Sequence, residues 1–101
     1  MAEAKQIEPR VLPYVAAITD GVRAVMQEQP NAFIAGEDVA GAGGVYGYYN
    51  GMLKEFGADR VYDTPISEEG IVGLGVGSAA TGCRPIIDLM FMDFLGECMD
   101  E

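Results

Sequence analysis

The sequence predicts an α/β protein in which helices alternate with the strands of a parallel sheet. Apolar residues recur at helical spacing near the N-terminus, and short apolar runs bounded by turn residues occur at three later places. A glycine-rich segment with helix-start signals separates the last two runs. The resulting order is helix, strand, helix, strand, helix, strand, helix, which is typical of layered folds with parallel pairing.

The first element expected is an amphipathic helix that begins near residue 11, after a polar and flexible arm at residues 1–10. Pro13 suits its first turn and Pro30 ends it. One face of this helix carries the apolar residues Val11, Tyr14, Val15, Ile18, Val22, Val25 and Met26.

The middle of the chain holds two predicted strands and a long loop. Residues 32–35 form a short apolar run that predicts a buried strand. Residues 36–51 combine glycines with three tyrosines and predict a loop, which in a compact domain is usually functional or mobile. A short helix at 52–56, closed by Gly57, and a second strand at 60–63 follow.

The next helix should begin after Ser67, whose hydroxyl is a plausible N-cap, and end near residue 82. Glu68 and Glu69 then lie in its first turn. Gly73 and Gly77 are four residues apart and share one face. Glycine inside a helix costs about 1 kcal/mol relative to alanine. We therefore expect the glycine face to allow close approach of another backbone or a ligand.

A third strand is predicted at residues 84–91, and Asp93 is a candidate cap for a last helix. The 101 residues suffice for one small domain, but three short strands make a thin sheet. No stop signal follows the last helical pattern. We therefore expect the chain to be part of something larger.

Charge and composition exclude several classes of protein. The chain has 16 acidic and 6 basic residues, a formal net charge of -10, which disfavours nucleic acid and anionic membranes as partners. No apolar run approaches the about 20 residues of a membrane span. Without histidine, acid–base chemistry must use carboxylates, tyrosines, cysteines or lysines. Cys83 and Cys98 form no CxxC pair, so we expect reduced thiols and no zinc site.

The paired carboxylates Glu68 and Glu69 allow three interpretations. They could stabilise the helix dipole, bind a metal, or exchange a proton with a ligand nitrogen. No third metal ligand lies at a convincing spacing. Burial would raise a carboxyl pKa and a helix N-terminus would lower it, so the sequence leaves the direction of any shift open.

Two other patterns have a structural and a functional interpretation. Residues 75–80 fit G-x-G-x-x-A, but the match lies inside the predicted helix, so we interpret it as chance rather than a dinucleotide site. Met90 and Phe94 follow the third strand, where ligands of open α/β sheets bind. They are either core residues or an apolar clamp for a heteroaromatic ring.

Five segments together resemble a known family. They are Gly-Glu-Asp-Val at 36–39, Gly-Gly-Val-Tyr at 43–46, Arg-Val-Tyr-Asp-Thr-Pro-Ile-Ser-Glu at 60–68, Gly-Cys-Arg-Pro-Ile at 82–86 and Met-Phe-Met-Asp-Phe at 90–94. In this order they resemble the beta subunit of the thiamine-diphosphate-dependent E1 component of 2-oxo acid dehydrogenase complexes, which includes pyruvate, branched-chain and acetoin dehydrogenases.

The resemblance implies a transketolase-like pyrimidine-binding fold, of which residues 11–101 would be the N-terminal part, truncated at its C-terminal end. It implies that Glu68 hydrogen-bonds N1′ of the thiamine aminopyrimidine and acts as the proton relay that activates the cofactor. It further implies that Met90 and Phe94 pack against that ring and that Glu37 is a second acidic residue of the pocket.

The resemblance also implies partners and a reaction. The alpha subunit would hold Mg²⁺ and the diphosphate in a heterotetramer with a second beta subunit, so this chain needs no metal site and should be inactive alone. The enzyme would decarboxylate a 2-oxo acid or cleave acetoin and pass the acyl group to a lipoyl-bearing E2, in the bacterial cytoplasm or the mitochondrial matrix. The alternatives are a non-catalytic assembly module that packs through its glycine-rich helix and a stand-alone dinucleotide-binding domain.

Overall fold

The computed structural model describes residues 9–101, so the arm expected at residues 1–10 lies almost wholly outside the described residues. The order of elements confirms the predicted alternation up to the third strand. The elements are α1 (Tyr14–Glu28), β1 (Ala32–Gly36), α2 (Met52–Phe56), β2 (Val61–Asp63), α3 (Glu68–Ala80) and β3 (Arg84–Asp88), followed by 3₁₀ turns at Met92–Phe94 and Gly96–Cys98.

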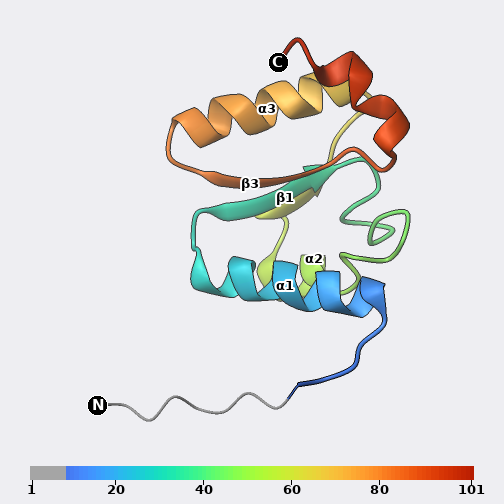
Figure 1. Cartoon of the computed structure of the whole chain (residues 1–101). Coiled ribbons are helices and arrows are strands. Elements are labelled where there is room, and N and C mark those ends of the chain that lie inside the picture. Colours follow the sequence, from blue (N-terminus) through green and yellow to red (C-terminus); the bar gives the residue numbers. More distant parts are fainter. Residues whose placement is uncertain (1–8) are drawn as a thin grey trace.

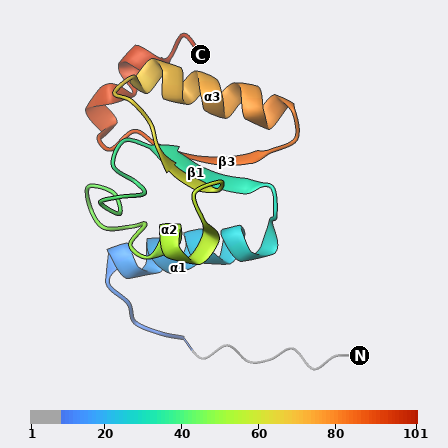
Figure 2. The same ribbon diagram turned by 180° about the vertical axis from the view of Figure 1, so that it is seen from behind.

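The three strands form one parallel sheet in the order β2-β1-β3. Helices α1 and α2 cover one face of the sheet and α3 covers the other, as two opposite views show (Figures 1 and 2). Gly36, the last residue of β1, lies opposite Asp63 of β2 and Asp88 of β3. All three strands therefore end at the same edge of the sheet.

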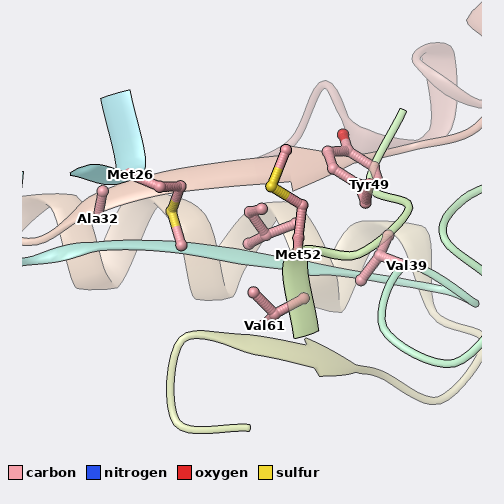
Figure 3. Packing of buried hydrophobic residues seen from close by; sticks show 7 residues of the cluster. Met26, Ala32, Val39, Tyr49, Met52 and Val61 are labelled. Carbon is pink, nitrogen blue, oxygen red and sulfur yellow. The ribbon is translucent and has the colours of Figure 1, made fainter. Parts of the chain in front are cut away.

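The main core lies between the sheet and the α1–α2 layer. β1 is buried along its whole length, as expected for a central strand with both faces covered. Met26 of α1 and Met52 of α2 are completely buried in this core, and Figure 3 shows them beside Val61 of β2. The cluster consists of Met26, Ala32, Ile34, Val39, Tyr49, Met52 and Val61.

Arg60 ties the end of α1 to the sheet. Its guanidinium donates hydrogen bonds to the carbonyl oxygens of Met26 (2.7 Å), Gln29 (2.8 Å) and Ala32 (2.9 Å). The last carbonyls of a helix have no partner within the helix, and Pro30 prevents α1 from continuing. One planar side chain therefore satisfies the carbonyls at the point where the chain leaves α1 for β1.

The start of α3 differs in one respect from the prediction. Ser67 stands at the N-cap position, but its hydroxyl makes no capping hydrogen bond. Its ψ angle is 82°, short of the extended value that places a capping oxygen over the open N–H groups. Ser67 contributes its backbone instead, because its carbonyl accepts the Ile71 N–H at 2.8 Å.

Close approach of α3 to the sheet occurs at Gly75, which lies on the opposite side of the helix from the predicted glycine face of Gly73 and Gly77. A Cβ atom on Gly75 would lie 2.7 Å from Cγ1 of Ile87 in β3, so only glycine lets α3 lie this close to the sheet. A Cβ on Gly73 would be 3.3 Å from a Glu101 carboxyl oxygen. Gly77 has no neighbouring atom within 4 Å of that position, so close approach there stays a prediction.

The C-terminal prediction was wrong in two places. The third strand ends at Asp88, because β1, with which it pairs, ends opposite at Gly36. Asp93 does not cap a helix. It lies within the first 3₁₀ turn and makes no capping hydrogen bond. The second turn begins at Gly96, a residue that disfavours continuous helix.

Candidate functional site

The predicted site residues gather at the carboxyl edge of the sheet. Glu37 directly follows β1, Glu68 opens α3, and Met90 follows β3. Both views place the loop of residues 37–51, the start of α3 and the two 3₁₀ turns at this end of the molecule (Figures 1 and 2). In open α/β sheets this edge is where ligands bind.

Glu37 and Glu68 form a carboxyl pair. Glu37 is 7% exposed, and its Oε1 atom has no hydrogen-bond partner among residues 9–101. Burial raises the pKa of Glu37, and the negative charge of Glu68 raises it further. Both effects favour the neutral form of the Glu37 carboxyl group.

The second 3₁₀ turn lies against the start of α3. Cys98 in this turn is 4% exposed, and its thiol donates to the Phe94 carbonyl at 3.3 Å. Burial raises the pKa of the Cys98 thiol, with smaller effects from the charges of Glu97, Glu68 and Glu69. Glu68 is thus half-buried beside this turn rather than extended freely into solvent.

Met90 and Phe94 are separated by the structure. Met90 lines an open cleft of about 350 Å³, together with Tyr48, Tyr49 and Asp88. Phe94 does not line this cleft, and its ring packs edge-on against Phe91 with centroids 5.8 Å apart. Glu37 and Glu68 are not lining residues of the cleft either. The apolar clamp therefore has one member in the cleft, and neither carboxyl group lines it.

The turn that carries Met90 is strained. Met90 has a φ of 64°, and the Phe91 N–H donates to the Leu89 carbonyl at 2.7 Å, closing a turn centred on Met90. A side-chain-bearing residue in this conformation costs of the order of 1–3 kcal/mol. The cost is offset in part by Asp88, whose Oδ1 accepts the Met90 N–H at 2.6 Å.

Two aspartates at this edge were not singled out from the sequence. Asp63 accepts backbone N–H groups of Ala40 (2.7 Å) and Gly41 (3.2 Å), and Asp88 accepts that of Met90. Each is the last residue of an outer strand, opposite Gly36. A search for polar residues at predicted carboxyl ends of strands would have found both.

The described residues also bear on the other interpretations. Residues 75–80 lie inside α3 and do not open it, so the G-x-G-x-x-A match lacks the strand-to-helix context of a dinucleotide site. No group of three or more potential metal-binding side chains occurs within residues 9–101. In the same residues, no helix has both the length and the apolar character needed to cross a membrane.

Residues 11–101 match the family model for the transketolase pyrimidine-binding domain. The chain is 42% identical, over 104 aligned positions, to the acetoin:2,6-dichlorophenolindophenol oxidoreductase subunit beta of Bacillus subtilis, with 91% of this chain and 30% of that protein aligned. It is 44% identical to the pyruvate dehydrogenase E1 component subunit beta of Staphylococcus epidermidis, covering 86% of this chain and 27% of that protein. The corresponding subunit of Leifsonia xyli is 44% identical over 93% of this chain and 28% of its own length.

The chain spans less than a third of the length of these relatives. The aligned part includes the carboxyl edge of the sheet, because the family match extends from residue 11 to residue 101. Glu37, Glu68, Met90 and Phe94 all lie within it.

Proposed function

Because the chain belongs to the family of transketolase pyrimidine-binding domains, we propose that it forms part of the beta subunit of a thiamine-diphosphate-dependent E1 enzyme. In this role it holds the aminopyrimidine ring of the cofactor. The observation that carries the proposal is the carboxyl pair of Glu37 and Glu68 at the carboxyl edge of the sheet.

The residues present fit an aminopyrimidine ring. A ring nitrogen needs a carboxyl group that can both hold and accept a proton, and the Glu37–Glu68 pair supplies one. The unpartnered Oε1 of Glu37 adds a buried acceptor, and such groups in native structures call for a partner. We assign Met90, which lines the cleft, to one face of the ring, and Phe94, whose ring packs against Phe91 outside the cleft, stays a proposed second contact.

Glu68 is the residue that acts on the cofactor in this proposal. Its carboxyl group would hydrogen-bond the ring nitrogen N1′ and would hold or move a proton at that atom. The raised pKa of Glu37 favours its neutral form and so lessens charge repulsion with Glu68. When bound, thiamine diphosphate supplies the carbanion chemistry of the reaction.

We assign the other functions of the enzyme to partners. An alpha subunit holds Mg²⁺ and the diphosphate, and a second beta subunit completes a heterotetramer. The substrate is a 2-oxo acid such as pyruvate, or acetoin, and the acyl group passes to a lipoyl-bearing E2. The proposed location is the bacterial cytoplasm, or the mitochondrial matrix in a eukaryote.

The test is turnover of the assembled complex with Glu68 changed to Gln or Ala. Loss of proton transfer by a positioned side chain lowers the rate about 10²- to 10⁴-fold, so kcat should fall in this range while assembly is unchanged. Glu69→Gln is the matched control, because Glu69 is the exposed neighbour in the same helical turn. Turnover of Glu68→Ala close to that of Glu69→Gln would refute the proposal.

The assembly-module alternative has one observation in its favour. After Glu68 and Glu69, α3 carries only small and apolar residues apart from Ser78, yet only Ile71 and Gly75 are buried, and Leu74 and Val76 are 39% and 51% exposed. Helices of this kind are normally covered. Loss of assembly in Glu68→Ala, with unchanged turnover per complex, would favour this alternative. We expect no binding of a nicotinamide nucleotide, and calorimetric titration checks that expectation.

A further inference from the structure

We propose that Asp88 is a positioning residue, which holds Met90 and Tyr49 as one wall of the cleft and thereby sets the affinity of the site for thiamine diphosphate. The proposal rests on the proposed function and adds to it a residue that does not touch the carboxyl pair. Three segments meet at Asp88, namely the end of β1, the loop of residues 37–51 and the turn after β3.

The first contact is with the Met90 turn. Oδ1 of Asp88 accepts the Met90 N–H at 2.6 Å, and this bond holds Met90 at a φ of 64°. Glycine adopts this conformation without strain, so a turn that served only to reverse the chain would favour glycine at residue 90. A methionine there indicates that its side chain is required in the cleft, and Met90 does line the cleft.

The second contact is with the loop of residues 37–51. Tyr49 is 7% exposed and belongs to the main core, and its ring is directed toward β3 (Figure 3). Tyr49 and Asp88 line the same cleft, and burial, followed by the charge and acceptor oxygens of Asp88, raises the pKa of Tyr49. The Asp88 carboxylate thus lies between a core residue of the loop and the strained turn.

The third contact fixes the position of Asp88 itself. Gly36 pairs with Asp88 across the sheet, and a Cβ on Gly36 would lie 2.9 Å from both Cβ and the carbonyl oxygen of Asp88. Glu37 is the next residue along the chain. The backbone that presents Glu37 and the side chain that holds Met90 are therefore in direct contact, with no space for a larger residue between them.

The bond to Met90 requires an acceptor atom and not a charge. Asparagine has the same shape and forms the same local hydrogen bonds to backbone N–H groups as aspartate. Its amide group can in addition donate to the Tyr49 hydroxyl. Alanine supplies neither contact. Asp88→Asn and Asp88→Ala therefore separate the positioning role from a purely electrostatic one.

The experiment measures thiamine diphosphate affinity by calorimetry, with the full-length chain assembled with its partner subunit. Asp88→Ala loses a hydrogen bond to a charged acceptor. We therefore expect this variant to bind thiamine diphosphate at least about tenfold more weakly than the unchanged protein. Asp88→Asn should stay within about twofold of the unchanged protein, because its side chain keeps the acceptor. Asp59→Ala is the control, since Asp59 is an exposed aspartate of the turn before β2.

A second readout is independent of the cofactor. Ultraviolet pH titration, with Tyr49→Phe to assign the signal, should show Tyr49 ionising at lower pH in both Asp88 variants. Thermal unfolding of the same complexes reports any general loss of structure.

The outcomes separate the two proposals. An Asp88→Ala complex that binds the cofactor as the unchanged protein does overturns the role of Asp88, as does an Asp88→Asn complex weakened tenfold. Unchanged Tyr49 titration in both variants also overturns it. If the unchanged complex does not bind thiamine diphosphate, the proposed function itself fails. If Asp88→Ala does not assemble, the Asp88→Asn affinity and titration decide the matter.

Discussion

Replacing Gly75 by alanine should weaken the attachment of α3 to the sheet, whereas the same change at Gly77 should not. A Cβ on Gly75 would lie 2.7 Å from Cγ1 of Ile87, while a Cβ on Gly77 would have no atom within 4 Å. Carbon atoms in contact prefer a separation of about 3.5–4.0 Å, so α3 and β3 would have to move apart by about 1 Å. Both variants lie in one helix and differ only in what the new methyl group meets.

The expected energies follow from two opposing effects. Alanine in a helix interior is favoured over glycine by about 1 kcal/mol at either position. Overpacking at Gly75 costs about 1–3 kcal/mol. Gly77→Ala should therefore stabilise the chain by about 1 kcal/mol, and Gly75→Ala should range from neutral to about 2 kcal/mol destabilising.

The assay is urea denaturation of both variants and the unchanged chain, with ellipticity and tyrosine fluorescence recorded together. The predicted separation between the variants is about 1–3 kcal/mol, or at least about 4 °C in Tm for a domain of this size. Because α3 carries Glu68 at its first residue, Gly75→Ala in the assembled complex should also weaken cofactor binding. Equal stability of the two variants would refute the packing argument. It would mean that the Ile87 side chain can move away from the new methyl group without loss of stability.

Two further predictions concern Glu37 and Arg60. Burial and Glu68 raise the pKa of Glu37 above its usual 4.5, so the folded chain keeps a proton that the unfolded chain loses. The free energy of unfolding should then fall as pH rises from 4.5 through the folded-state pKa, and urea titrations at several pH values should show that Glu37→Gln lacks this fall. Arg60→Lys should lower the free energy of unfolding by about 2 kcal/mol, because lysine cannot bond three carbonyl oxygens with a planar group. Thermal unfolding measures this loss, and an equally stable variant would contradict the prediction.

The sequence predicts most elements of this fold because their signals are local. The apolar spacing of α1, the run at residues 32–35 and Gly57 after α2 each depend on a few neighbouring residues. The third strand was predicted too long because its end is set by β1, more than fifty residues earlier in the chain. Pairing between distant segments leaves little trace in either segment alone.

The candidate site shows the same contrast between residues that the sequence identifies and residues whose role depends on contacts between distant segments. Glu37 and Glu68 were chosen because motifs in this sequence resemble those of a family, and the structure brings them together. Asp88 was missed because its role depends on the backbone of Met90 and on Tyr49, a residue of a loop without regular periodicity. Phe94 was grouped with Met90 by its proximity in sequence, but the turn at Met90 and the following 3₁₀ turn direct the two side chains to different surroundings.

The central claim is that the acid at the first position of α3 meets the pyrimidine ring of thiamine diphosphate. A crystal structure of the assembled complex with this cofactor measures that contact directly. We predict a Glu68 carboxyl oxygen about 2.6–3.2 Å from the ring nitrogen N1′, with Glu37 beside it. A ring held elsewhere, with Glu68 bonded only to water or to its own chain, would contradict the account.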